Sequence, residues 1–104
     1  MGREIRWSKL VHRDLDQILS YWDERTGTTK YSDKLTYELI VTAELLSIYP
    51  SLGRKTRKQH IFQKIVAKHF FIIYKLYPEH ITILRFWDTR QHPRKLKRYF
   101  NSEE

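Results

Sequence analysis

The chain has 104 residues, of which 40% are hydrophobic and 14% are aromatic, and its formal net charge is +8. This length suits a single domain over residues 1–104, and the apolar content is too high for a disordered chain. The sequence contains no cysteine, which excludes disulfides and thiolate metal sites. Because no stretch resembles a signal peptide or a membrane span, we expect a cytoplasmic protein that does not associate with a membrane.

The first expected elements are a strand from Glu4 to Trp7 and a helix from about Lys9 to Glu24. Ser8 stands at the position of an N-cap, directly before the helical pattern. Apolar residues then recur at helical spacing, whereas Asp14, Asp16 and Asp23 are expected on other faces. The apolar residues of this pattern are Val11, Leu15, Ile18, Leu19 and Trp22.

A second helix is expected from about Lys30 to Tyr49, after a break at residues 26–28. Pro50 and Gly53 end it. Two long helices joined by so few residues form an antiparallel hairpin. The apolar stripe of the second helix consists of Tyr31, Leu35, Leu39, Ala43, Leu46 and Tyr49.

The rest of the chain has the period of β-strands. Three runs rich in Ile, Val, Phe and Tyr, at His60–Val66, His69–Tyr77 and Ile81–Trp87, are separated by short turns, so we expect antiparallel neighbours. In the second run one face comprises Phe70, Ile72, Tyr74 and Leu76. In the third run simple alternation places Ile81 and Ile83 on one face with Arg85 and Trp87, and Phe86 on the other.

The predicted fold class is α+β: an N-terminal strand, a two-helix hairpin and a three-stranded antiparallel sheet, in the order β-α-α-β-β-β. A short helix from Arg94 to Phe100 would follow Pro93. The helical hairpin would cover one face of the sheet.

Positive charge is concentrated in the second half of the chain. Residues 1–50 contain seven Lys or Arg and eight Asp or Glu, whereas residues 51–104 contain thirteen and four, and no acidic residue occurs from Ser51 to Pro78. Such a surface attracts phosphate backbones or an acidic partner. The residues expected to bind such a target or partner are Arg54, Lys55, Arg57, Lys58, Lys75, Trp87, Arg94 and Lys95.

The order of these elements resembles the RelE/ParE superfamily of toxins from type II toxin–antitoxin systems. The resemblance covers nearly the whole chain and rests on four pieces in the right order. These are Trp7-Ser8 before the first helix, the segment from Leu46 to Gly53, the strand around Phe70–Tyr74, and the segment from Ile83 to Pro93 with its Arg-x-x-Pro turn.

The superfamily divides by target. The resemblance implies either a RelE-like enzyme that cleaves mRNA on the ribosome or a ParE-like inhibitor of DNA gyrase. Metal-free RNA cleavage needs groups that move protons and cations that stabilise the phosphate. Lys64, Arg90 and Tyr99 match RelE-like positions, and Lys68, Arg85 and His92 are candidates to complete that catalytic set.

The catalytic set of the RelE-like branch is incomplete, because Phe71 stands where that branch has an arginine on the central hairpin. An aromatic ring cannot clamp a phosphate as a guanidinium does. Both helices are also long, so the sequence favours the ParE-like branch. Whether the chain is an enzyme stays open, with a metal-free mRNA endoribonuclease as the alternative.

The resemblance also implies a cognate antitoxin, which we expect to be acidic or amphipathic and to form a hetero-oligomer with the toxin. It would lie over the helices and the sheet and neutralise part of the cluster from Arg54 to Lys75. The five histidines show no metal-ligand spacing, and no cofactor is expected. A third reading is a non-toxic module that binds nucleic acid through its basic half.

Overall fold

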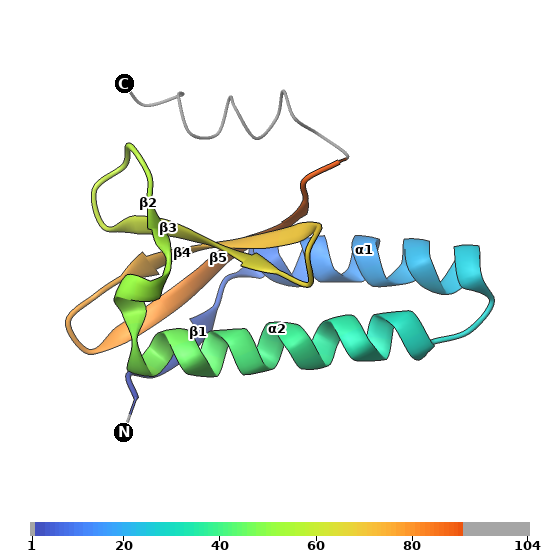
Figure 1. Ribbon diagram of the computed structural model, residues 1–104, viewed down its shortest axis with the longest axis horizontal. Helices are drawn as coiled ribbons and strands as arrows, with labels where there is room; N and C mark the ends of the chain where they lie inside the picture. Colours follow the sequence, from blue (N-terminus) through green and yellow to red (C-terminus); the bar gives the residue numbers. More distant parts are fainter. Residues whose placement is uncertain (1, 91–104) are drawn as a thin grey trace.

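The computed structural model describes residues 2–90, which form two long helices and a sheet (Figure 1). In chain order the elements are β1 (Glu4–Trp7), α1 (Lys9–Thr26), α2 (Lys30–Ile48), a 3-10 turn (Pro50–Leu52), β2 (Arg54–Lys55), β3 (Ile61–Val66), β4 (Phe70–Leu76) and β5 (His80–Asp88). The helix expected from Arg94 to Phe100 lies outside these residues.

The sheet has five strands in the order β1-β5-β4-β3-β2 and is mixed, because β1 runs parallel to β5 while the other neighbours are antiparallel. The α+β class and the element order are therefore confirmed, but a purely antiparallel three-stranded sheet is wrong. Both helices separate β1 from the other strands, and such a long connection allows parallel pairing. β2 has only two residues, too few for a recognisable period.

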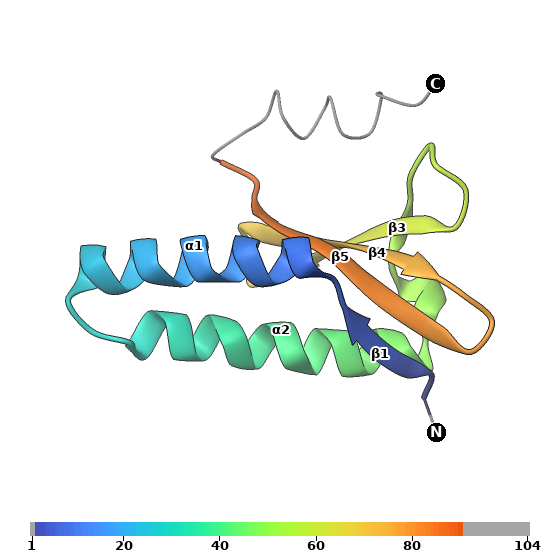
Figure 2. The ribbon, with the colours of Figure 1, turned by 180° about the vertical axis from the view of Figure 1, so that it is seen from behind.

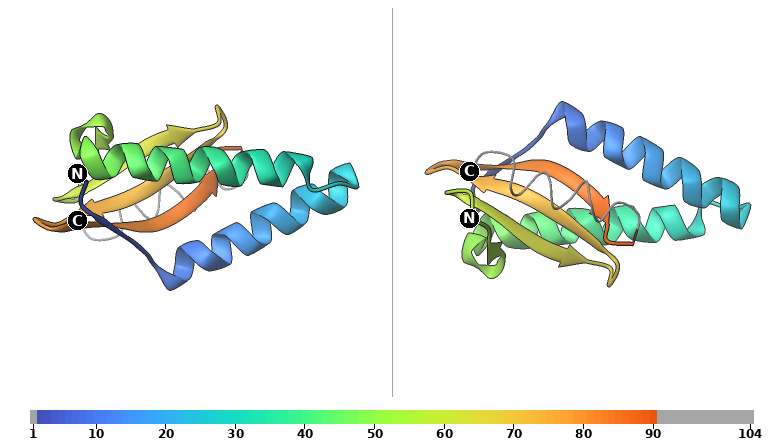
Figure 3. Two further views of the ribbon diagram at one scale, coloured as in Figure 1. Left: turned by 90° about the horizontal axis from the view of Figure 1, so that it is seen from below. Right: turned by 90° about the horizontal axis from the view of Figure 1, so that it is seen from above.

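The two helices differ in how they meet the sheet. α2 crosses one face of the sheet, whereas α1 runs beside β5 (Figure 3). The far ends of both helices extend beyond the strands, as the view from behind also shows (Figure 2). The junction between α1 and β5 is therefore a second place, besides the core under α2, where helix and sheet meet.

The start and end of α1 follow from local chemistry. The Ser8 hydroxyl accepts a hydrogen bond from the Val11 N–H at 3.0 Å, as expected of an N-cap. At the other end Gly27 has a φ of 74° and its N–H donates to the Asp23 carbonyl. This left-handed conformation suits glycine, and it ends the helix two residues later than the sequence predicts.

The core lies between the helices and one face of the sheet. Phe70, Ile72 and Tyr74 of β4 are fully buried in it, and Leu76 packs against it, which confirms the predicted face. In β5 the predicted division of residues between the two faces is wrong after Ile83. Tyr74 pairs with Ile83 but Ile73 pairs with Arg85, so an extra residue, Leu84, forms a β-bulge.

The bulge reverses the alternation along β5. Phe86 therefore joins Ile81 and Ile83 in the core, whereas Arg85 and Trp87 do not. Periodicity in the sequence assumes regular alternation, and a one-residue bulge reverses every later position.

Tyr74 explains the glycine that ends the segment from Leu46 to Gly53. Its hydroxyl donates to the Pro50 carbonyl at 2.6 Å, and burial raises its pKa to about 12, so it remains a donor at neutral pH. A Cβ on Gly53 would collide with this hydroxyl. The 3-10 turn can therefore pack on β4 only with a glycine at this position.

Candidate functional site

The junction of α1 with β5 begins where β1 ends. Beyond Trp7 no strand among residues 2–90 lies beside the edge of β5, and α1 with its N-cap Ser8 supplies hydrogen bonds there instead. The Ser8 N–H donates to the Ile83 carbonyl at 3.0 Å, and the Ser8 hydroxyl donates to the Leu84 carbonyl at 2.7 Å. The Phe86 N–H donates to the Asp14 carboxylate at 3.0 Å. The edge is thereby covered and cannot pair with another strand.

Asp14 also binds Arg85. Both carboxylate oxygens accept hydrogen bonds from the guanidinium, each at 2.8 Å. The side chains are nearly buried, with exposed fractions of 9% for Asp14 and 15% for Arg85. The guanidinium carbon lies 4.4 Å from the centre of the Trp87 ring, in a cation–π contact. These contacts fix the position of Arg85.

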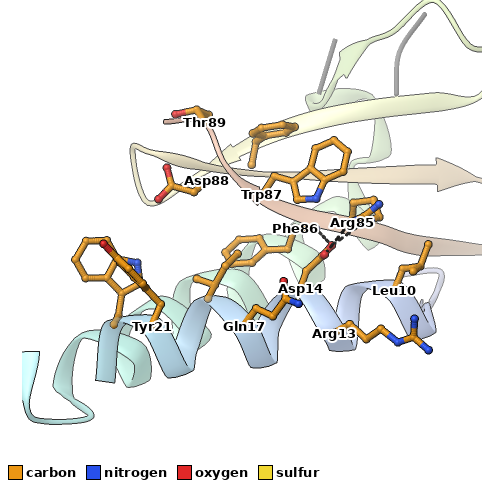
Figure 4. A pocket seen from close by; sticks show the side chains of 13 residues that line it. Leu10, Arg13, Asp14, Gln17, Tyr21, Arg85, Phe86, Trp87, Asp88 and Thr89 are labelled. Atoms are coloured by element: carbon orange, nitrogen blue, oxygen red, sulfur yellow. Dashed lines mark hydrogen bonds and ion pairs between the residues drawn. The ribbon is translucent and has the colours of Figure 1, made fainter. Parts of the chain in front are cut away.

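A cavity of about 300 Å³ opens at this junction (Figure 4). α1 supplies the exposed Leu10 and Tyr21 and the exposed cation Arg13. β5 supplies Arg85 and Trp87. The cavity therefore combines aromatic walls with a charged rim.

A second carboxylate–guanidinium pair follows at the end of β5. Arg90 donates to both oxygens of Asp88, each at 2.9 Å, and its backbone N–H also donates to Asp88. The Arg90 guanidinium lies over the rings of Trp22 and Phe70. Burial alone would raise the pKa of Asp88, but the hydrogen bonds and the charge of Arg90 outweigh it and hold that pKa below its usual range.

Replacing Asp88 with asparagine is expected to lower the free energy of unfolding by about 1–2 kcal/mol at pH 7. Because the folded-state pKa is depressed, the carboxylate stabilises the fold at pH values above its unfolded pKa, about 4. That contribution disappears as the pH falls through the folded pKa. Urea unfolding of both proteins at pH 7 and at about pH 2.5 measures it.

The two proteins should therefore differ at neutral pH and converge in acid. An equal difference at both pH values would contradict the assigned role of the Asp88 charge. Asp16→Asn is the control, because Asp16 is an exposed carboxylate on α1.

The residues of the hypothetical nuclease set do not form one constellation within residues 2–90. Lys64 lies on β3 opposite Ile72, which faces the core. Lys68 lies in the turn between β3 and β4, with a φ of 70°. Arg85 and Arg90 each bind a carboxylate, as described above. His92 and Tyr99 lie outside the described residues.

Phe71 faces the side of the sheet away from the core. It is 3% exposed, and its ring centre lies 6.1 Å from that of Trp87 in an edge-to-face arrangement. The position where RelE-like enzymes carry an arginine thus packs against an aromatic neighbour. Phe71 therefore contributes an edge-to-face aromatic contact at this position instead of a cation.

The predicted binding residues lie on two parts of the fold. Arg54, Lys55, Arg57 and Lys58 belong to β2 and the loop that follows it, and Lys75 lies on β4 with its ammonium 5.2 Å from the centre of the Tyr77 ring. Trp87 lies instead at the α1–β5 junction. Arg94 and Lys95 lie outside the described residues.

Sequence reasoning missed the role of Asp14 because it placed this residue on a face away from the apolar stripe of α1. In the structure Asp14 is buried, like Val11 and Ile18. Its spacing of three and four residues from these two was the available signal, because residues at this spacing share one helix face. An acidic residue on a buried face requires a charged or hydrogen-bonding partner.

Neither a metal centre nor a membrane helix is found in the part of the chain that the structure describes. No group of three or more His, Asp and Glu side chains in that part could hold a metal ion. No described helix is long and apolar enough to span a bilayer.

Comparison with known proteins gives one family. Residues 5–93 match the sequence model of the family described as the ParE toxin of the type II toxin–antitoxin system parDE. The chain belongs to the ParE toxin family. This confirms the predicted branch of the superfamily and makes the protein a toxin of the type II toxin–antitoxin class, for which the family implies an antitoxin partner.

A solved structure supports the same fold. A chain of the chromosomal ParDE toxin–antitoxin system from P. aeruginosa superposes with a TM-score of 0.73 at 16% sequence identity, covering 86% of this chain and 98% of that one. At this identity the similarity supports the fold alone. No curated protein matches the chain.

Proposed function

We propose that this ParE-family toxin stops growth by binding DNA gyrase in the cytoplasm, and that an acidic antitoxin neutralises it. The observation that carries the proposal is the pairing of Arg85 with Asp14 and of Arg90 with Asp88. Two arginines that a nuclease would use on a phosphate are already neutralised. This geometry supports inhibition by binding more than cleavage.

The gyrase proposal is tested by adding purified toxin to gyrase, ATP and relaxed plasmid. Supercoiled product should be nearly abolished once toxin exceeds gyrase, because each enzyme molecule would then be occupied. Relaxation of supercoiled plasmid by a type I topoisomerase should be unaffected. Lys64→Ala should inhibit as well as the unaltered toxin, since the proposed mode of action needs no catalytic lysine.

An experiment in growing cells separates the alternatives. Expression from a repressible promoter should change plasmid supercoiling before protein synthesis falls. A fall in protein synthesis while supercoiling is still normal, abolished by Lys64→Ala, would instead establish the RelE-like mRNA endoribonuclease. Absence of both effects would favour the non-toxic nucleic-acid-binding module.

The antitoxin proposal rests on the outer face of α2 as well as on positive charge. α2 is apolar on its inner face, where Leu35, Leu39 and Leu46 are buried, and part of its outer surface also carries large exposed apolar side chains. Contiguous apolar side chains of this kind on a surface mark an interaction site. We call the exposed set on α2 and on the turn that follows it the α2 stripe: Tyr37, Ile40, Val41, Leu45, Ile48, Tyr49 and Leu52, each at least 42% exposed.

An amphipathic acidic segment of the antitoxin would suit both the α2 stripe and the cations that follow Gly53. Its apolar face would cover the α2 stripe, and its carboxylates would reach the cations that follow Gly53 in the chain. Tyr37 is the most exposed residue of the α2 stripe, at 69%. The assembly would be a hetero-oligomer whose stability falls as salt increases.

A further inference from the structure

The hairpin of β2 and β3 with the loop between them, residues 54–66, carries five cations and no acidic residue. We call it the basic hairpin. Its loop stands out from the sheet on the side away from α2 (Figure 1). Arg54, Lys55 and Arg57 are exposed, and within residues 2–90 none of them forms a salt bridge. Their charge is available to a partner.

The loop of the basic hairpin is held in one conformation by hydrogen bonds. The Thr56 N–H and hydroxyl both donate to the Ile61 carbonyl, at 3.1 and 2.8 Å. The Thr56 hydroxyl also accepts from the Lys58 N–H at 3.2 Å, and the Ile61 N–H donates to the Lys58 carbonyl. The backbone that carries the cations is thus ordered before any partner binds, which lowers the entropy cost of binding.

The cations occupy both faces of the basic hairpin. Lys55 pairs in register with Phe62, which packs against the core on the α2 side, whereas Arg54 pairs with Gln63 on the opposite side. Lys64 shares the face of Lys55. An acidic peptide lying against the sheet would meet only one of these faces.

We propose that the loop end of the basic hairpin enters the major groove of duplex DNA and contacts the phosphates of both strands. β3 is paired with β4 along its whole length, so the projecting loop, and not the whole hairpin, is the part that enters. The major groove is about 12 Å wide and has phosphates along both walls. Cations on both faces and at the tip match that arrangement. The inference deepens the proposed function, because a toxin bound to gyrase lies beside the DNA that the enzyme holds.

The test uses fluorescence anisotropy with purified toxin and a labelled duplex of about 25 base pairs. A duplex of this length is longer than the site expected for one small domain. Arg54→Ala, Lys55→Ala and Arg57→Ala are combined in one variant. The control combines Lys9→Ala, Lys30→Ala and Lys34→Ala, which removes three exposed cations from the helices and leaves the same net charge. Circular dichroism checks the fold of both.

The hairpin variant should bind the duplex about tenfold more weakly or worse, and the control within about twofold of the unaltered toxin. The slope of log K against log salt should become shallower by about 0.9 for each phosphate that the variant no longer neutralises, or roughly 2 to 3 in all. The variant with Arg54→Lys and Arg57→Lys should keep most of the affinity, since it preserves the charge.

Equal losses of affinity in the hairpin variant and the control would overturn the proposal, because net charge alone would then explain binding. Equal or tighter binding of a single strand of the same sequence would also overturn it, as would binding of polyglutamate without binding of the duplex. Duplex binding through the hairpin without inhibition of gyrase would overturn the proposed function and leave this inference intact. Gyrase inhibition combined with equal duplex binding by both variants would overturn this inference and leave the proposed function intact.

Discussion

Replacing Asp14 with alanine is expected to lower the free energy of unfolding by about 3 kcal/mol or more, and Tm by more than about 10 °C. The change leaves the nearly buried guanidinium of Arg85 without its counter-ion. It also leaves the Phe86 N–H at the edge of β5 without an acceptor, which carries a further cost. Urea unfolding and thermal unfolding followed by circular dichroism measure both quantities.

Asp16→Ala is the matched control, because Asp16 is an exposed carboxylate on the same helix and should change stability by less than about 0.5 kcal/mol. The combined variant Asp14→Ala with Arg85→Met tests the mechanism. Removing both charges leaves no unpaired ion, so it should be less harmful than Asp14→Ala alone. If instead the two changes simply add, the pair does not carry the stability that we assign to it.

The second large effect is expected at the α2 stripe. Val41→Asp combined with Ile48→Asp should weaken antitoxin binding by about 4 kcal/mol, or roughly a thousandfold, if each residue is an anchor worth about 2 kcal/mol. The two positions are seven residues apart and so lie on the same face of α2. Each exchange removes apolar contact area and places a negative charge against an acidic partner.

Isothermal titration of the purified toxin with the antitoxin encoded beside it measures this effect. Leu10→Asp on α1 is the control for Val41→Asp, because the two residues are similarly exposed, at 48% and 43%. It should weaken binding only a few-fold. Similar losses of affinity for Leu10→Asp and Val41→Asp would show that the antitoxin does not use α2 as its main contact.

The salt dependence of antitoxin binding distinguishes the contributions of the α2 stripe and of the basic hairpin. The stripe variants should bind more weakly at every salt concentration, because apolar contacts depend little on ionic strength. Neutralising the basic hairpin should weaken binding mainly at low salt. An antitoxin complex equally stable at low and high salt would remove the basic cluster from the interface.

The local pattern of the sequence was sufficient for most of the fold. Apolar residues at a period of 3.6 and then of two located both helices and the three longer strands, to within two residues of the observed ends. These periods reflect which side of each element is buried, and burial is the dominant stabilising term. Ser8 marked the start of α1 because its hydroxyl caps the helix, whereas the requirement for glycine at position 53 comes from its contact with Tyr74.

Three features depended on tertiary structure. Parallel pairing of β1 with β5 joins segments separated by both helices. The bulge at Leu84 exists only in the register with β4, and it decides that Phe86 rather than Trp87 enters the core. The partners of Asp14 lie 71 and 72 residues away in the chain, a distance at which spacing carries no information.

Composition and order were thus enough to indicate a basic α+β protein. The resemblance to the RelE/ParE superfamily indicated a toxin, and Phe71, which could be read directly from the sequence, cast doubt on a nuclease. Whether an arginine is free to act on a phosphate could not be read in this way. Arg85 becomes an anchor rather than a free cation only when the fold brings Asp14 within hydrogen-bonding distance. Asp88, in contrast, lies two residues from Arg90 in the chain and pairs with it locally. Charge is a property of the sequence, but its neutralisation is a property of the folded chain.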